Sequence, residues 1–138
     1  MNILLTGASG FIGGAVERKL LSNSNINLSV ALRRPRAENS SSNAYVIDAL
    51  SVDTNWKLAL TGQDVVIHAA ARAHVMDEVA INPLAEFRRV NVDGTLNLAK
   101  QAASAGVRRF IFISSIKVNG ERTARGHSFT ADDAPFPE

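Results

Sequence analysis

The stretch Met1-Asn2-Ile3-Leu4-Leu5-Thr6-Gly7-Ala8-Ser9-Gly10-Phe11-Ile12-Gly13-Gly14 decides the fold of this chain. Residues 3–5 form a short apolar run that predicts a buried strand, and an apolar-periodic stretch typical of a helix begins at Phe11. Three glycines, at positions 7, 10 and 13, lie at the junction. The first permits a tight turn, the second lets a pyrophosphate approach the backbone, and the third lets the helix pack closely on the strand. Since free N–H groups at a helix start attract phosphate, residues 7–13, which we name the glycine turn, predict a phosphate-binding site.

The composition is that of a globular protein with a single domain. The 138 residues are 46% apolar and 20% charged, and the net charge of +2 gives no reason to expect a nucleic-acid or anionic-membrane partner. The chain has no cysteine, which excludes disulfides and thiolate metal sites and fits a reducing compartment. No apolar run approaches the roughly 18–20 residues of a membrane span, and the N-terminus lacks the features of a signal peptide. We therefore expect a cytoplasmic protein.

Strands and helices alternate along the rest of the sequence. Further strands are predicted at residues 28–32, 45–48, 64–68 and 110–113, the last two buried, with an exposed loop at 37–43. The first helix has Phe11, Ile12, Val16, Leu20 and Leu21 as its apolar positions and Glu17, Arg18 and Lys19 on the other face. Asp53 is the predicted N-cap of a brief helix that ends at Gly62, and Pro83 precedes one long helix at 84–105. This alternation predicts an α/β fold, a doubly wound parallel sheet (Rossmann fold) of about five strands.

Two arginines follow the second predicted strand, where NAD-binding proteins carry an acidic residue about 20 residues beyond the glycine motif. Arg33 stands twenty residues after Gly13, Arg34 follows it, and no carboxylate occurs before Glu38. A guanidinium group suits a ribose 2′-phosphate better than a neutral hydroxyl. The sequence therefore favours NADP(H) over NAD(H), the alternative being that both arginines only flank a solvated loop.

Four further motifs follow the glycine turn in a fixed order. They are Asp48 after the third strand, His68-Ala69-Ala70-Ala71, Asn91-Val92-Asp93-Gly94-Thr95, and Ser114-Ser115-Ile116-Lys117-Val118-Asn119-Gly120. Together the five motifs resemble those of the extended short-chain dehydrogenase/reductase family. More narrowly, the chain is similar to the NAD(P)-dependent epimerase/dehydratase group, which acts on nucleotide sugars and has UDP-glucose 4-epimerase as its best-known member.

The resemblance implies roles for individual residues. Ser115 is implied as the catalytic residue, hydrogen-bonded to the reacting sugar hydroxyl or carbonyl. The cofactor is implied to lie against Gly7, Ser9, Gly10, Phe11, Ile12, Gly13, Arg33, Arg34, Asp48, Ala49, Ala69, Ala70, Asn91 and Ser114. In this scheme Asp48 and Ala49 lie along the adenine, the alanines after His68 border the nicotinamide ribose and phosphates, and Asn91 holds neighbouring backbone.

Each of these roles has a simpler alternative. Asp48 can be an ordinary strand-end aspartate, and the alanines after His68 can merely relieve crowding between helix and sheet. Asn91 can be a plain exposed side chain, and Ser115 can merely cap the end of a strand. His68 has no His, Asp or Glu at metal-ligand spacing, so we expect no metal site there.

The sequence also departs from the family pattern. Val118-Asn119-Gly120 stands where relatives often have Val-Tyr-Gly, which leaves the substrate-side contacts of that loop open. The only tyrosine is Tyr45, on the wrong strand, so the Tyr-x-x-x-Lys pair that serves these enzymes in proton exchange is absent. The resemblance thus implies that residues 1–138 are an NAD(P)-binding Rossmann domain, truncated before that pair and before the substrate domain, with no turnover of its own.

For the full-length protein, the resemblance implies an NAD(P)-dependent nucleotide-sugar epimerase that acts by hydride transfer at a sugar carbon. Two alternatives stay open: a nucleotide-sugar 4-keto reductase that uses NADPH, and a non-catalytic module that senses NADP(H). The serine pair at 114–115 favours an enzyme, because a sensor does not need it. A homodimer is left open.

Overall fold

The computed structural model describes residues 1–35, 42–73 and 82–136 of the chain. The described residues do not include 37–41 of the predicted exposed loop, among them Glu38, or residues 74–81 of the stretch between 72 and 82. The strands are β1 Asn2–Thr6, β2 Asn27–Leu32, β3 Asn43–Val46, β4 Val65–His68 and β5 Arg109–Phe112. The helices are α1 Phe11–Leu21, α2 Lys57–Leu60, α3 Pro83–Arg88 and α4 Thr95–Ser104, with a π-helical segment η1 at Arg89–Gly94 and a 3₁₀ turn η2 at Ile116–Asn119.

The strands form one parallel sheet in the order β3-β2-β1-β4-β5. The order reverses at β1, which pairs with β2 on one edge and with β4 on the other. Thr6, the last residue of β1, is in register with Ala31 on one side and with His68 on the other. In open parallel sheets, ligands bind outside the carboxyl ends of the strands at such a reversal. The predicted doubly wound parallel sheet is confirmed.

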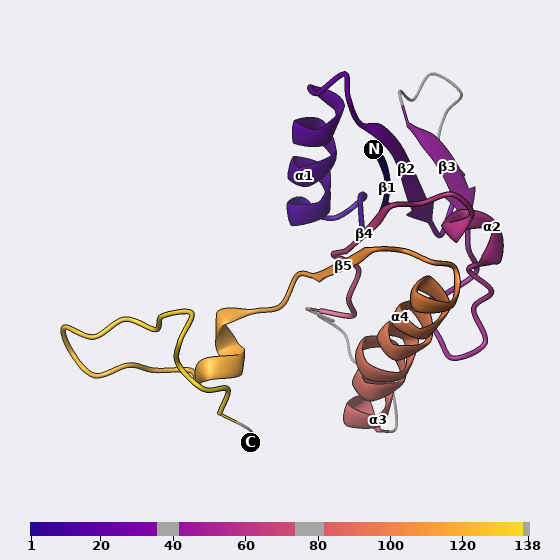
Figure 1. The fold of residues 1–138 in the computed structure, drawn as a ribbon. Helices are drawn as coiled ribbons and strands as arrows, with labels where there is room; N and C mark the ends of the chain where they lie inside the picture. Colours follow the sequence, from indigo (N-terminus) through magenta and orange to yellow (C-terminus); the bar gives the residue numbers. More distant parts are fainter. Residues whose placement is uncertain (36–41, 74–81, 137–138) are drawn as a thin grey trace.

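Two hydrophobic clusters cover the two faces of the sheet, and α1 lies on one side of it with α2 and α4 on the other (Figure 1). On the α1 side, Val16 and Leu20 pack on a cluster of strand residues that includes Ile3, Leu5, Val30 and Ile67. On the other side, the buried cluster contains Leu4, Ala31, Leu50, Trp56, Ala59, Leu60, Val66, Leu98 and Ala102. Each strand of the sheet centre is therefore buried on both faces, as expected for a parallel sheet.

The predicted apolar face of α1 is wrong at its N-terminal end, and one residue of the predicted polar face is buried. Phe11 is 95% exposed and Ile12 is also exposed, because the first turn of the helix lies at the carboxyl edge of the sheet rather than over it. Glu17, placed by its charge on the solvent side, is buried, and its carboxylate accepts a hydrogen bond from the Ser42 hydroxyl at 3.1 Å. Ser42 is itself buried, so the predicted exposed loop ends before it.

The short helix α2 begins later than predicted, and Asp53 does not cap it. Asp53 lies in a preceding turn, and the side chain of Asn55 accepts a hydrogen bond from the Lys57 N–H at 3.0 Å instead. Because α2 has only four residues, it buries one side only, and Leu58 is 78% exposed. Gly62 follows the helix with a φ of +71°, as predicted for its C-terminal end.

The predicted long helix is a continuous helical run with a different hydrogen-bond pattern in its middle. α3 begins at Pro83, and the side chain of Asn82 caps it by accepting from the Ala85 N–H at 3.0 Å. The π-helical η1 then separates α3 from α4, and Gly106 follows the end of α4 with a φ of +80°. π-Helical segments within α-helices are rare and occur frequently at functional sites.

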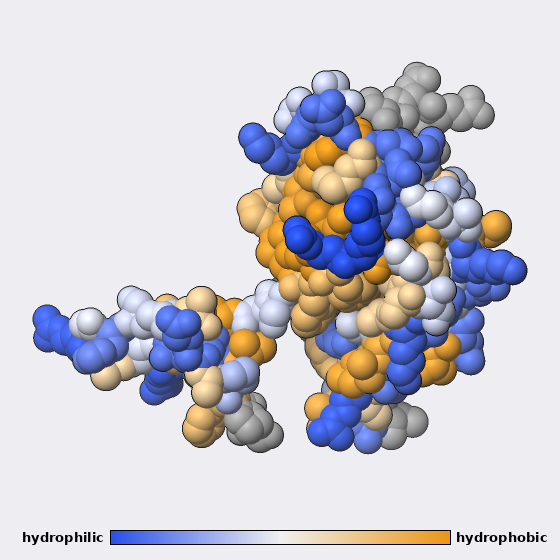
Figure 2. Space-filling view, viewed as in Figure 1, coloured by the Kyte–Doolittle hydropathy of each residue, from blue (hydrophilic) through white to orange (hydrophobic). Residues whose placement is uncertain are grey.

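The prediction of a buried fifth strand is wrong. β5 lies at the edge of the described sheet, and Phe112 is 51% exposed, with Ile111 exposed as well. Residues 114–136 then leave the body of the molecule as a projecting segment (Figure 1). Hydrophobic surface stays visible on the body and at the base of this segment (Figure 2). No helix in the described part of the chain combines the length and the apolar character that a membrane crossing requires.

Candidate functional site

The glycine turn joins β1 to α1 by a route that only glycine can follow at two positions. Gly7 has a φ of +75°, and a Cβ there would lie 2.6 Å from the backbone of both Ala69 and Ala70. A Cβ on Gly13 would lie 2.0 Å from the carbonyl oxygen of Gly7. The turn is closed by a hydrogen bond of 2.9 Å from the Gly10 N–H to the same carbonyl. Gly7 and Gly13 are therefore required by the fold itself.

Gly10 is different, because the protein's own packing does not require a glycine there. Its φ of −86° and ψ of 171° are extended backbone that any residue adopts, and a Cβ would meet only the Gly7 carbonyl oxygen, at 3.3 Å. The residue is exposed at the carboxyl edge of the sheet. A missing side chain at this position keeps the surface of the turn open to a ligand.

The N-terminus of α1 presents N–H groups that the helix does not use. Gly14 donates to the Gly10 carbonyl at 2.8 Å, so the three N–H groups before it precede the first intrahelical bond. Within the described residues, no side chain caps this helix and its first turn carries no acidic residue. Ser9, Phe11 and Ile12 are exposed around these donors. The arrangement suits the negative charge of a phosphate group.

A hollow of about 650 Å³ adjoins the glycine turn at the ends of β2 and β3. It is lined by Ser9, Leu32, Arg33, Arg34, Pro35 and Asp48. A hydrogen bond of 2.8 Å from the Ile47 N–H to the Leu32 carbonyl ends the pairing of the two strands, and the chains diverge from there. The structure thus brings together four predicted cofactor contacts from three separate segments.

The two guanidinium groups of this hollow are available to a ligand. In the part of the chain that the structure describes, neither Arg33 nor Arg34 makes an ion pair or a side-chain hydrogen bond, and both are exposed. Ala49 follows Asp48 but does not line the hollow, and its carbonyl accepts a hydrogen bond from the Thr54 hydroxyl. The hollow therefore combines a net positive charge with open space beside the glycine turn.

The end of β4 lies on the other side of β1 from the hollow and contacts the glycine turn. Ala69 and Ala70 are half-buried against Gly7, and the Ala70 N–H donates to the Thr6 hydroxyl at 3.2 Å. The preceding His68 is fully buried, and burial lowers its pKa to about 4. In the described residues, no group of three or more His, Asp or Glu side chains is placed to hold a metal ion.

Asn91 lies in the π-helical segment η1, and it is not the plain exposed side chain of the simpler alternative. Its amide oxygen accepts from the Arg72 N–H at 2.7 Å, and its amide nitrogen donates to the Arg72 carbonyl at 2.9 Å. These two bonds fix the backbone just beyond Ala69 and Ala70. The side chain therefore holds neighbouring backbone, as the resemblance implies, and does not itself lie in the hollow with Arg33.

The serine pair follows β5 on the same edge of the sheet. The Ile113 N–H donates to the His68 carbonyl at 2.9 Å, which extends the β4–β5 pairing by one residue before Ser114. Ser114 and Ser115 are exposed, and the Ser115 hydroxyl accepts from the Lys117 N–H at 3.3 Å as the cap of η2. The residue is exposed to solvent, so its hydroxyl is not sealed by packing while it caps this turn.

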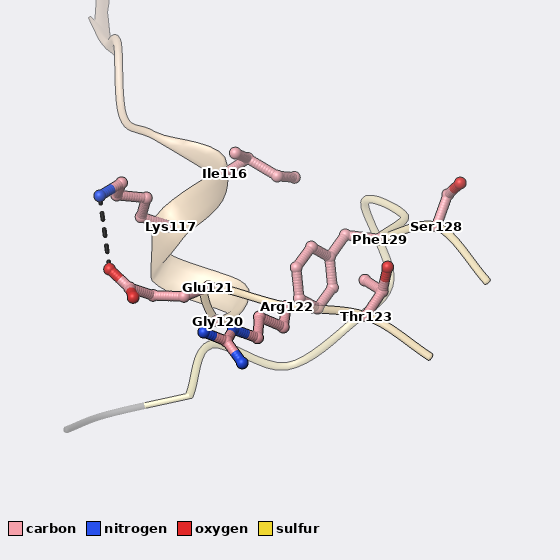
Figure 3. Close-up of a pocket in the computed structure, with 8 residues that line it drawn as sticks. All are labelled: Ile116, Lys117, Gly120, Glu121, Arg122, Thr123, Ser128 and Phe129. Carbon is pink, nitrogen blue, oxygen red and sulfur yellow. Dashed lines mark hydrogen bonds and ion pairs between the residues drawn. The ribbon is translucent and has the colours of Figure 1, made fainter. Parts of the chain in front are cut away.

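A second hollow, of about 580 Å³, lies within the projecting segment and contains none of the predicted site residues (Figure 3). The Lys117 ammonium group pairs with the Glu121 carboxylate at 3.4 Å on its rim, and the Phe129 ring forms part of its wall. Its walls come from this one segment alone. We therefore place the candidate site at the first hollow and at the adjoining ends of β1, β4 and β5.

Sequence reasoning missed several residues that support the site. Thr6 and Thr95 flank the buried His68, while Asn97 and Gln101 on α4 donate to the Thr54 carbonyl at 2.9 and 2.8 Å. These hydrogen bonds from side-chain amides hold the loop that follows Asp48. A signal was present for His68, since a histidine inside an apolar strand must find hydrogen-bond partners when it is buried.

Comparison with known proteins gives a consistent picture. A model of the NAD dependent epimerase/dehydratase family matches residues 3–138. The UDP-glucose 4-epimerase of Vibrio cholerae is 44% identical over 137 residues, which cover 99% of this chain and 42% of that relative. The dTDP-glucose 4,6-dehydratase of Streptomyces griseus is 28% identical over 154 residues, which cover 98% of this chain and 43% of that relative.

Solved structures resemble the fold over its whole length. MoeE5 in complex with UDP-glucose and NAD has a TM-score of 0.78 and 30% identity, with 99% of this chain and 43% of that chain covered. The UDP-glucose 4-epimerase of Thermotoga maritima with UDP-glucose has a TM-score of 0.74 and 28% identity, with 100% and 45% covered. The present chain thus spans less than half the length of these proteins.

Proposed function

Because the chain belongs to the NAD dependent epimerase/dehydratase family, we propose that residues 1–138 form the domain that binds the nicotinamide dinucleotide of a nucleotide-sugar epimerase. One observation carries the proposal. Gly10 has neither a positive φ nor a protein atom closer than 3.3 Å to the place of a Cβ, yet it lies at the uncapped start of α1. A pyrophosphate that approaches the backbone at this point explains why a side chain is missing.

The proposed dinucleotide lies across the carboxyl edge of the sheet. Its pyrophosphate accepts from the free N–H groups at the start of α1. Its adenosine half occupies the hollow that Ser9 and Asp48 line, and its nicotinamide half lies along Ala69 and Ala70 toward the serine pair. The bound ring supplies the capacity to take up and return a hydride. The chain's own groups fix the position of the ring. The small side chains of Ala69 and Ala70 leave room for it against the end of β4.

We propose further that NADP(H) is bound in preference to NAD(H). The support is the pair of exposed guanidinium groups of Arg33 and Arg34, which lack partners within the described residues and line the hollow beside Asp48. A 2′-phosphate accepts charge-assisted hydrogen bonds from such groups, whereas a 2′-hydroxyl gains less from them. MoeE5, which is similar to this chain, was solved with NAD, so the preference is a property that we assign to this chain alone.

For the whole protein we propose epimerisation of a nucleotide sugar, with Ser115 as the hydrogen-bond partner of the reacting hydroxyl or carbonyl. Exposure of Ser115 at the same edge of the sheet supports this role. The same two arginines favour a second candidate, a 4-keto reductase that consumes NADPH. A pure sensor of NADP(H) would leave the exposed serine pair without a purpose. We propose that the substrate is held by a part of the protein that this domain does not include, and that a homodimer forms in the full-length protein.

The chain by itself is proposed to have no turnover. Proton exchange with a sugar hydroxyl needs a positioned acid or base, and the only tyrosine, Tyr45, lies in β3 and packs on the hydrophobic cluster beside Trp56. The loss of a general acid/base typically costs about 10²–10⁴ in rate. Supplying UDP-hexoses with NAD(P)⁺ and their 4-keto derivatives with NAD(P)H, and following absorbance and products, tests this. Turnover at the rate of the V. cholerae epimerase would refute it.

Binding is tested by titrating NADPH and NADH into the wild-type chain and into Arg33→Asp. We expect tighter binding of NADPH by the wild type and loss of about ten- to a hundredfold in NADPH affinity in the variant, since one charge-assisted bond contributes about 1.5–3 kcal/mol. Arg125→Asp makes the same change of charge on the projecting segment and should leave both affinities unchanged. Equal affinity of the wild type for NADH and NADPH would contradict the preference, and binding of neither would contradict the proposed function.

A further inference from the structure

His68 is a fully buried titratable side chain for which the proposed function has so far found no use. Register explains its surroundings: it is the cross-strand neighbour of Thr6 in β1 and of Phe112 in β5. The imidazole contacts the Thr6 hydroxyl through Nδ1 at 2.6 Å and the Thr95 hydroxyl through Nε2 at 3.0 Å. The Phe112 ring stacks beside it, at 5.8 Å between ring centroids. The ring is thus fixed on every side.

The hydrogen bonds around Thr6 determine which imidazole nitrogen carries the proton. The Ala70 N–H can only donate, and it donates to the Thr6 hydroxyl oxygen at 3.2 Å. The hydroxyl oxygen has a second lone pair, but within the described residues the buried Thr6 hydroxyl contacts no acceptor other than Nδ1 of His68. Its proton is therefore donated to Nδ1, which is unprotonated. The ring proton is consequently on Nε2 and is donated to the Thr95 hydroxyl. Since burial lowers the pKa of His68 to about 4, the imidazole is neutral at pH 7.

This chain of hydrogen bonds joins the start of α4 to the ends of β1 and β4. It runs from Thr95 at the start of α4, through His68 and Thr6, to the backbone N–H of Ala70. At the same place, a Cβ on Gly7 would lie 2.6 Å from the Ala70 nitrogen, so the glycine turn and the end of β4 are in backbone contact. A displacement of Ala70 therefore moves the surface on which the proposed nicotinamide half rests.

We propose that His68 is a positioning residue for the dinucleotide, holding Ala70 against the glycine turn through Thr6 as the neutral Nε2–H tautomer. The inference rests on the proposed dinucleotide binding and adds the contacts that fix the position of Ala70 beside the glycine turn. Two substitutions separate the hydrogen bond of His68 to Thr6 from its hydrogen bond to Thr95. His68→Asn keeps an acceptor near the position of Nδ1 and loses the reach to Thr95, whereas His68→Gln keeps a donor near the position of Nε2 and loses the acceptor for Thr6.

The experiment measures dissociation constants for NADPH and NADH with the wild-type chain and both variants, alongside urea unfolding followed by the fluorescence of the single tryptophan. We expect His68→Gln to bind about five- to tenfold more weakly, the value of one hydrogen bond, and His68→Asn to stay within about twofold of the wild type. Asn is one methylene smaller than Gln, so a purely structural role for the buried His68 would weaken His68→Asn at least as much as His68→Gln. Equal affinities in the two variants would overturn the inference.

Two further measurements keep the proposal decidable. The ¹⁵N chemical shifts of the His68 ring should show protonation at Nε2 in the wild type, and a proton on Nδ1 would overturn the inference. Thr6→Val, which removes the hydroxyl, should weaken binding as His68→Gln does, while Thr6→Ser should restore it, and this pair replaces the His68 variants if they do not fold. A wild-type chain that binds neither dinucleotide refutes the proposed function, whereas binding that Thr6→Val leaves unchanged refutes this inference alone.

Discussion

Replacing Gly13 by alanine tests whether close contact between α1 and the glycine turn is needed for the fold. The new Cβ would lie 2.0 Å from the Gly7 carbonyl oxygen and 2.5 Å from the Gly7 carbonyl carbon, so helix and turn must separate by about 1 Å or more. Overpacking costs about 1–3 kcal/mol, and the upper value applies because both opposing atoms belong to the backbone. Alanine gains about 1 kcal/mol over glycine within a helix. The expected net loss is about 2 kcal/mol, or about 8 °C in Tm.

Gly14→Ala is the matched control, since it makes the same chemical change one residue further along α1. A Cβ there would lie 3.3 Å from the Ala8 carbonyl oxygen and 3.6 Å from an Arg18 side-chain nitrogen, which can move. We expect this variant to be as stable as the wild type or up to about 1 kcal/mol more stable. Urea unfolding followed by the fluorescence of buried Trp56 measures both free energies of unfolding. Equal stability of the two variants would refute the close approach at Gly13.

Three further predictions address the site. Gly10→Ala should fold with a free energy of unfolding within about 1 kcal/mol of the wild type yet lose most dinucleotide affinity by titration; unchanged affinity would contradict the proposed path of the pyrophosphate. Asn91→Ala loses both hydrogen bonds to the Arg72 backbone, and its free energy of unfolding should be about 1–2 kcal/mol lower than that of the wild type. Asn91→Asp keeps the acceptor and should recover part of that loss in stability, as measured by urea titration. His68 takes up a proton at about pH 6.5 in the unfolded chain and at about 4 in the folded one. The free energy of unfolding should therefore fall by up to about 3 kcal/mol from pH 6.5 to 4, and a slope in His68→Asn equal to that of the wild type would contradict the burial of a neutral imidazole.

The sequence predicted the sheet and the gathering of the candidate-site residues at one of its edges, because the signals for both are local. Three glycines between an apolar run and an amphipathic helix identify the turn, and this signal does not depend on the rest of the sequence. Parallel strands present their carboxyl ends at one edge, so Ser9, Arg33 and Asp48 had to meet there once the alternation of strands and helices was recognised. Their gathering around one hollow followed from topology alone.

The errors arose where the answer depends on neighbours that are distant in the sequence. The apolar run at 110–113 reads as a buried strand, but its exposure is set by its place at the edge of the described sheet. Glu17 is charged, yet the Ser42 hydroxyl lies opposite its carboxylate and allows its burial. The bonds of His68 depend on the register between β1 and β4, which no local pattern encodes. The π-helical segment around Asn91 keeps a helical apolar periodicity, so periodicity alone does not distinguish it from an α-helix.

The strand order has a consequence for co-translational folding. β1 is synthesised before β4, yet it lies at the centre of the sheet and needs β4 to complete its pairing. About sixty residues separate the two strands, which amounts to about 3–12 s of synthesis at 5–20 residues per second. During that interval one edge of an apolar strand has no native partner. The nascent chain should therefore depend on chaperones until His68 has emerged, and substitutions that weaken the pairing of β1 with β4 should reduce the soluble yield in cells before they reduce the stability of the purified protein.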